Sequence, residues 1–204
     1  CEEKKLTLIT LSNFHNDLFP KSWDKHVIYF MIPDWVYEHS IPENKKDYIY
    51  ASSLMKGYSS TLPLWKYLKN EKLLSKTDIL NVCLPGYDNP TQDISDKDYG
   101  INYLGTLKFK EVIELMAKCR GMFYVNTMPE TFGISVVLAD ILKTTPFVYG
   151  INGLGSLSEL INNKNLTTDM QEYINMFKTY SSLNETPRNF RPKMVIKWWK
   201  KVLI

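Results

Sequence analysis

A carboxylate and a glycine lie close together, just ahead of an apolar helical pattern, in the run MPETFGIS at residues 128–135. Glu130 can accept hydrogen bonds from sugar hydroxyls, and Gly133 lets the backbone approach a bound group closely. The free N–H groups and the dipole at a helix N-terminus attract phosphate. The run is therefore a candidate sugar-phosphate site, although the same residues also fit a plain strand-to-helix turn in which Glu130 caps the helix. Position alone leaves both interpretations open.

A second glycine-containing run, GLGSLS at residues 153–158, resembles the dinucleotide-binding pattern G-x-G-x-x-G with serine in the third glycine position. A dinucleotide domain needs several more strands after this turn, whereas the residues that follow have a helical pattern. We therefore interpret the glycines as a donor-side loop leading to Glu159, where a helix start would again face a phosphate or a sugar. A nicotinamide or flavin site is the alternative.

The composition is that of a folded chain without a nucleic-acid partner. Of the 204 residues, 44% are hydrophobic and 13% aromatic, which is enough to bury one core. A formal net charge of +3, with the lysines scattered among acids, is too small to indicate binding to DNA or RNA.

The C-terminal segment combines lysines with two tryptophans. As an amphipathic helix it could make peripheral contact with an anionic membrane surface. The alternative is a terminal helix with buried tryptophans and a solvated lysine face. The residues concerned are Lys193, Lys197, Trp198, Trp199, Lys200 and Lys201.

The three cysteines form no C-x-x-C pair and no metal-like cluster with the three histidines. We therefore expect no metal site and no cofactor, and a reduced, cytoplasmic location. Two glycosylation sequons, at 165–167 and 184–186, leave a secretory location open. No apolar run has the length of a membrane span, and no signal peptide is visible. Because the chain begins at Cys1 rather than at methionine, we expect that an upstream part of the protein is missing.

Strand-length apolar runs alternate with helix-length amphipathic segments, which predicts an α/β fold with a parallel sheet covered on both faces. In the segment 108–119, apolar residues recur every three or four positions while charged residues take the other face, as in a helix that lies on a sheet. Beyond residue 161 the pattern is purely helical, and 87–100 has the composition of a surface loop. The expected strands are 6–11, 26–32, 47–51, 78–84, 121–125 and 146–149, and the expected helices are 59–70, 108–119, 133–142, 156–161, 170–180 and 192–202.

Several of these segments together resemble one enzyme family. The run ETFGIS at 130–135 is similar to the E-x-F-G-I-S segment of retaining glycosyltransferases of family 4, which have the GT-B fold of two facing Rossmann-like domains. The run YASSLMKG at 50–57 looks like the first strand and Lys-Gly loop of the second domain, YLG at 103–105 looks like its F-L-G step, and 146–159 looks like its glycine-rich return. The motifs occur in the family's order over residues 27–161.

The resemblance implies a domain division and a fold. Residues 1–26 would be the tail of an N-terminal domain or a linker, since 8–14 looks like the last strand of the family's first domain. Residues 27–204 would form the Rossmann-like domain that binds the nucleotide-sugar, with a helical C-terminal tail.

The resemblance also implies roles for single residues. Lys56 would contact the donor diphosphate and stabilise the leaving group, and Glu130 would hold the sugar hydroxyls and the charge that develops at the anomeric carbon. Phe132, Gly133 and Ile134 would offer backbone donors to the sugar and phosphates, and Gly105 would lie near the base. The residues expected to bind the donor are Ser53, Gly57, Gly105, Thr131, Phe132, Gly133, Ile134 and Leu138.

Two positions depart from the family's pattern. The family's motif continues to a second glutamate that usually holds the ribose hydroxyls, but the matching residue here is Leu138. Asp140 lies two residues further, about 200° around a helix, and should not reach the same point. The arginine that usually precedes the Lys-Gly pair is replaced by Ser52 or Ser53.

The function expected from the resemblance is transfer of a hexose from a nucleoside diphosphate sugar to a hydroxyl acceptor, on a carbohydrate, lipid or protein, with retention of configuration and without a metal. Because of the two departures, an inactive nucleotide-sugar-binding module is the first alternative. A nucleotide-sugar epimerase of GT-B shape is the second.

Overall fold

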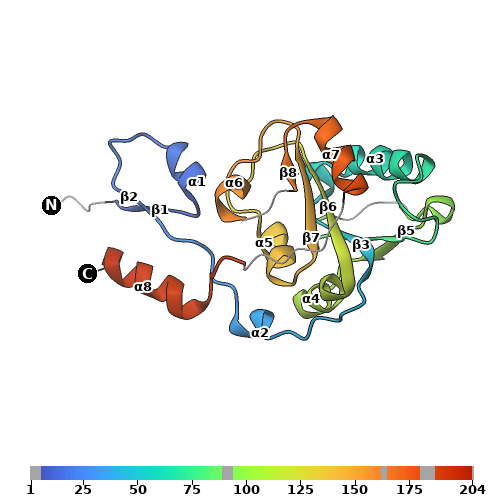
Figure 1. Ribbon diagram of the computed structural model, residues 1–204. Helices are drawn as coiled ribbons and strands as arrows, with labels where there is room; N and C mark the ends of the chain where they lie inside the picture. The colour runs from blue at the N-terminus through green and yellow to red at the C-terminus, as the bar shows by residue number, and fades with distance from the viewer. Residues whose placement is uncertain (1–5, 89–93, 162–164, 180–186, 204) are drawn as a thin grey trace.

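The protein is built around a parallel sheet. The structure is a computed structural model that describes residues 6–88, 94–161, 165–179 and 187–203. In this part of the chain six parallel strands form one sheet in the order β5-β4-β3-β6-β7-β8 (Figure 1). The α/β class is therefore confirmed. The strands are β3 (Lys46–Ala51), β4 (Leu80–Cys83), β5 (Ile101–Gly105), β6 (Cys119–Asn126), β7 (Thr145–Gly150) and β8 (Leu166–Thr167).

The strand order reverses between β3 and β6. From β3 the chain adds β4 and β5 on one side, and β6, β7 and β8 on the other. At such a switch point the connections leave the sheet in opposite directions, so a crevice opens beyond the carboxyl ends of the two strands. The fold thus predicts a binding site where β3 and β6 end.

Both faces of the sheet are covered by helices. Helices α3 (Tyr58–Asn70) and α7 (Met170–Lys178) bury Trp65, Tyr173 and Phe177 against Phe123 of β6. On the other face, α4 (Phe109–Lys118) and α5 (Ile134–Ile141) bury Met116 and Val136 in a second cluster, together with Met122. Adjacent residues of β6 face opposite sides of the sheet, which explains why this strand is apolar throughout.

The first residues of the chain form a small unit beside the sheet. Strands β1 (Leu8–Thr10) and β2 (Lys25–Val27) pair in parallel in a separate two-stranded sheet, connected through α1 (Asn13–Asp17). The C-terminal helix α8 (Pro192–Leu203) lies close to this unit (Figure 1). Its Val195 is buried, and Trp198 packs edge-on against Tyr29.

The lysines of α8 are exposed, and both tryptophans are half-buried. This arrangement fits a terminal helix with a solvated face, and peripheral membrane contact stays a prediction. Along the described ranges, no helix combines the length and the apolar composition that crossing a bilayer requires. The sequon at 184–186 lies outside the described residues, as does Cys1.

Two expectations about the elements were wrong. The strand expected at 26–32 ends at Val27, because its partner β1 ends at Thr10 and Ile32 donates to the Phe190 carbonyl outside the ladder. Beyond residue 161 the chain is not purely helical, since β8 pairs with β7 before α7 begins. A strand was also missed: β5, which pairs with β4 directly after the loop expected at 87–100, was not among the expected strands.

The remaining differences concern boundaries. The helix expected at 108–119 ends at Lys118, and Cys119 already has the extended backbone of β6. Two short helices, α1 and α2 (Asp34–Tyr37), were not expected. The other helices and the central strands lie where the apolar pattern placed them, as far as the described residues extend.

Two glycines at the sheet's carboxyl edge provide a matched test of the fold. Gly57 and Gly105 both have positive φ, of 113° and 69°, but a Cβ on Gly57 would lie 2.1 Å from the Val125 carbonyl oxygen, whereas Gly105 has nothing within 4 Å. We expect Gly105→Ala to cost about 1 kcal/mol from backbone strain alone and Gly57→Ala at least about 3 kcal/mol. Urea unfolding followed by tryptophan fluorescence would measure both. Equal losses would contradict the described contact between Gly57 and β6.

Candidate functional site

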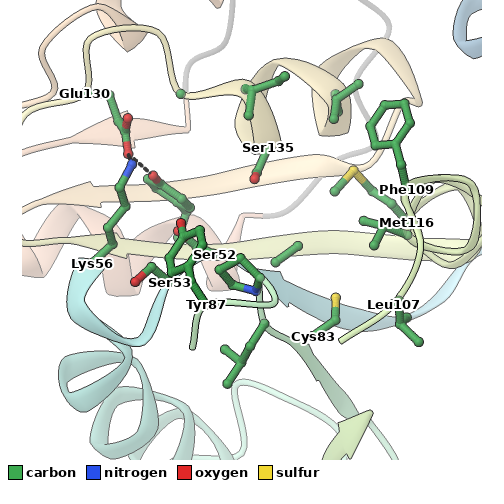
Figure 2. A pocket seen from close by; sticks show the side chains of 18 residues that line it. Ser52, Ser53, Lys56, Cys83, Tyr87, Leu107, Phe109, Met116, Glu130 and Ser135 are labelled. Carbon is green, nitrogen blue, oxygen red and sulfur yellow. Dashed lines mark hydrogen bonds and ion pairs between the residues drawn. The ribbon is translucent and has the colours of Figure 1, made fainter. Parts of the chain in front are cut away.

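A pocket of about 400 Å³ opens at the switch point, between the carboxyl ends of β3, β4 and β6 and the first turn of α5 (Figure 2). Its polar end contains Lys56 and Glu130, and its other end is apolar. The residues lining it are Ala51, Ser52, Ser53, Lys56, Cys83, Leu84, Pro85, Tyr87, Leu107, Phe109, Val112, Met116, Tyr124, Glu130, Gly133, Ile134, Ser135 and Leu138.

Lys56 is placed by a short turn after β3. The Ser53 hydroxyl accepts a hydrogen bond from the backbone N–H of Met55 and so begins a single 3₁₀ turn, Leu54–Lys56. Gly57 ends this turn in the left-handed conformation, and its close approach to Val125 leaves no room for a side chain. Lys56 is thereby held at the mouth of the pocket, where its Nζ lies 2.7 Å from Glu130 Oε1.

Glu130 is a buried carboxylate with two donors. Only 5% of the residue is exposed, and the Tyr124 hydroxyl donates to the same Oε1 that Lys56 contacts. Burial raises the pKa of Tyr124, and the charge of Glu130 raises it further, so the hydroxyl stays protonated and can only donate. An ammonium and a phenol together compensate for removing this carboxylate from water.

The first turn of α5 contributes backbone donors. Gly133 is its N-cap, with φ of 70° and no capping side chain, and a Cβ there would lie 2.4 Å from Leu157 Cδ2. Val136 and Val137 donate to the Gly133 carbonyl, whereas the preceding N–H groups of Ile134 and Ser135 have no partner within the helix by geometry. Both residues line the pocket. The positive end of the helix dipole therefore faces the same space as the Lys56 ammonium.

The second glycine run, residues 153–158, contacts the backbone of Glu130. Gly155 pairs with Glu130 in an isolated parallel bridge, and the backbone N–H of Ser156 donates to the Glu130 carbonyl at 2.8 Å. A Cβ on Gly155 would lie 2.4 Å from that carbonyl oxygen. Glu159 lies outside the pocket lining and accepts hydrogen bonds from the backbone and side chain of Asn13, both at 2.8 Å. The run therefore positions Glu130 and connects the N-terminal unit to the sheet domain.

The structure brings together six of the ten residues expected at the site. Four others lie outside the pocket lining. Gly57 lies behind Lys56 and Gly105 at the end of β5. The Thr131 carbonyl accepts a hydrogen bond from the Ser12 hydroxyl, and the Phe132 ring packs against Phe30 and Phe190. The residues that line the pocket are Ser53, Lys56, Glu130, Gly133, Ile134 and Leu138.

Several lining residues were missed by sequence reasoning. Tyr124 lies within the apolar strand 121–125, on the face of β6 that points to α5. A residue with a hydroxyl in an apolar strand, close in sequence to the Glu130 run, was the signal that could have identified it as a site residue. At its apolar end the pocket is bounded by Leu107, Phe109, Val112 and Met116. The helical spacing of Val112 and Met116 indicated burial, but not that part of this helix face borders a cavity.

Cys83 and the possible metal ligands bear on two other kinds of chemistry, a thiolate nucleophile and a metal site. Cys83 lines the pocket, but burial raises the pKa of its thiol to about 12, so the thiolate is scarce at neutral pH. Within the described parts of the chain, no three side chains of histidine, cysteine, aspartate or glutamate gather closely enough to hold a metal ion.

Removing the Tyr124 hydroxyl should be costly because its acceptor is charged. We expect Tyr124→Phe to lower the free energy of unfolding by about 1.5–3 kcal/mol, as for other hydrogen bonds to charged groups. Tyr173→Phe is the matched control, since Tyr173 is also fully buried but donates to the neutral Phe147 carbonyl at 3.3 Å. It should cost about 0.5–1.5 kcal/mol. Urea unfolding compares the two, and a smaller loss for Tyr124→Phe would contradict the described contact.

Comparisons with known proteins identify the fold. No family model matches the sequence, and no curated protein matches it. Among solved structures, TarM matches with a TM-score of 0.62 and 12% identity over 84% of this chain and 35% of TarM. Anabaena Alr3699/HepE in complex with UDP and glucose matches with a TM-score of 0.61 and 18% identity, over 84% of this chain and 52% of HepE. A glycosyltransferase from Rickettsia africae ESF-5 matches with a TM-score of 0.56 and 13% identity, over 98% of this chain and 63% of that enzyme.

The chain therefore spans between 35% and 63% of the length of these three proteins. At such low identities the likeness concerns the fold alone. It confirms the predicted fold class, a Rossmann-like α/β domain of the GT-B type.

Proposed function

We propose that this chain is the donor-binding half of a GT-B glycosyltransferase that transfers a sugar from a nucleoside diphosphate to a hydroxyl acceptor with retention of configuration. The observation that carries the proposal is the convergence of Lys56, the first turn of α5 and the buried Glu130 on one pocket at the switch point. The similar HepE structure, which holds UDP and glucose, supports a nucleotide-sugar as the ligand.

The polar end of the pocket suits a diphosphate. The Lys56 side chain is 37% exposed and flexible, so its ammonium can turn from Glu130 toward an incoming phosphate without unfolding the turn that holds it. The N–H groups at the start of α5 add donors that are already oriented. As the bond to the sugar breaks, negative charge grows on the diphosphate, and both groups stabilise it more in the transition state than in the ground state.

Glu130 would act on the sugar. A buried carboxylate beside the phosphate site can accept hydrogen bonds from sugar hydroxyls and stabilise positive charge at the anomeric carbon. In the proposed reaction the bond from the anomeric carbon to the phosphate oxygen breaks, and the acceptor oxygen bonds to that carbon on the same face. The acceptor proton passes to the departing diphosphate, so no side chain of this domain needs to act as the base.

The acceptor site is proposed to lie largely in a further domain. The chain spans only part of the proteins that it resembles in structure. In the described unit at the N-terminus, Ser12 donates a hydrogen bond to the Thr131 carbonyl and Asn13 donates one to Glu159. Thr131 directly follows Glu130 in the sequence. We expect no turnover by this chain without such a domain.

An inactive nucleotide-sugar-binding module is the second candidate. The observation that favours it is the apolar inner end of the pocket, where Leu138 offers no hydrogen bond to a nucleoside. The two candidates share a ligand and differ in chemistry. Release of UDP from a UDP-sugar by the complete protein supports the transferase, and binding without release supports the module.

Titration with UDP in a calorimeter tests the proposed donor site. We expect micromolar binding that weakens at least about tenfold, or 1.4 kcal/mol, in Lys56→Ala, because the diphosphate loses its side-chain cation. Lys66→Ala is the matched control: Lys66 is ion-paired with Asp96 and 39% exposed, yet lies outside the pocket lining. It should bind UDP as the unmodified protein does. Millimolar binding, or equal affinity in Lys56→Ala, would reject the site.

A further inference from the structure

One oxygen of the Glu130 carboxylate is shared by two donors. Figure 2 shows Lys56 reaching Glu130 at the polar end of the pocket, and the Lys56 ammonium and the Tyr124 hydroxyl both donate to Oε1. The second oxygen, Oε2, accepts no hydrogen bond from the part of the chain that the structure describes. A ligand that draws Lys56 away therefore leaves this carboxylate with one of its two described donors, Tyr124.

The two donors differ in their freedom to move. Lys56 has a half-buried side chain on a single turn at the mouth of the pocket, whereas Tyr124 is 2% exposed and lies within the strand β6. Burial raises the pKa of Tyr124, and the charge of Glu130 raises it further, so the phenol keeps its proton and remains a donor. Lys56 can thus change partners, while Tyr124 stays beside the carboxylate.

The proposed function requires this exchange of partners, and the inference rests on that function. The diphosphate takes the Lys56 ammonium, and the Glu130 carboxylate must then stay in place to meet the sugar hydroxyls. A buried charge that loses its donors is costly, and this cost would weaken donor binding. A hydrogen bond from a fixed hydroxyl reduces the cost, because hydrogen bonds to charged acceptors are stronger than those between neutral groups.

We propose that Tyr124 is a positioning residue for donor binding, which holds the Glu130 carboxylate in place once Lys56 has moved to the diphosphate. Tyr124 acts through Glu130 and through the release of Lys56, and it need not touch the diphosphate itself. Without the hydroxyl, Glu130 would depend on Lys56 alone and would retain the ammonium against the incoming phosphate. Tyr124 thereby makes the cation of the site available to the ligand.

A double-mutant cycle on UDP affinity, measured in a calorimeter, tests this role. We expect Tyr124→Phe alone to weaken UDP binding by about tenfold, because the departure of Lys56 then leaves Glu130 without a side-chain donor. In the Lys56→Ala background the same change should alter the affinity by less than about twofold, since no ammonium leaves Glu130 when UDP binds. The cycle thus measures whether Tyr124 acts through Lys56.

Tyr173→Phe is the matched control for removing a buried hydroxyl. Tyr173 is fully buried, donates to the Phe147 carbonyl and lies outside the pocket lining, so its replacement should leave the affinity for UDP unchanged. A loss of equal size for Tyr124→Phe in both Lys56 backgrounds would show a general disturbance of the pocket and would overturn the inference. No loss in the background that keeps Lys56 would overturn it as well.

The outcomes separate this inference from the proposed function. Failure of the unmodified protein to bind UDP, or equal affinity in Lys56→Ala, would reject the donor site and the inference with it. If UDP binding depends on Lys56 but not on Tyr124, the inference alone is wrong. If Tyr124→Phe does not fold, a crystal structure of the unmodified protein with UDP decides. Lys56 on a phosphate with Tyr124 still on Glu130 would support the role, and Glu130 turned away from Tyr124 would overturn it.

Discussion

The buried Glu130 carboxylate is the constraint on which the rest of the site depends. A carboxylate that is only 5% exposed needs donors, and it receives them from Lys56 and from the Tyr124 hydroxyl. The ion pair joins the turn after β3 to the segment between β6 and α5, across the switch point. Gly57 allows the turn that carries Lys56 to pack on β6, and Gly155 allows the second glycine run to pack on Glu130, because each glycine approaches a neighbouring backbone too closely for a side chain.

This constraint also explains how the fold serves the proposed chemistry. The segments that follow the two strands at the switch point carry the two charged groups, and the helix that follows β6 directs its first N–H groups into the same pocket. Hydrogen bonds and close backbone contacts hold both segments in place, while the lysine side chain keeps the freedom to change partners. The apolar inner wall, made by α4 and α5, belongs to the core that supports the sheet. The residues of this wall would therefore both contact the ligand and stabilise the fold.

Local patterns in the sequence predicted the parts of the fold that local forces determine. The apolar strands 47–51 and 121–125 and the helix after Gly133 could be predicted because each is defined by its own residues. The edge strands β5 and β8 are short and half-exposed, so only their pairing with β4 and β7 identifies them. At the site, Lys56 and Glu130 were predicted from motifs. The hydrogen bond from Tyr124, the packing of Phe132 into the core and the apolar wall depend on tertiary contacts that no single segment contains.

A crystal structure of the protein with UDP bound would show whether the pocket at the switch point is the donor site. We expect that the Lys56 ammonium leaves Glu130 Oε1, which it contacts at 2.7 Å, and binds a phosphate oxygen at the first turn of α5. The uridine should then lie in the apolar end of the pocket, and Tyr124 should still donate to Glu130. UDP bound elsewhere, with the contact between Lys56 and Glu130 intact, would show that this pocket is not the donor site.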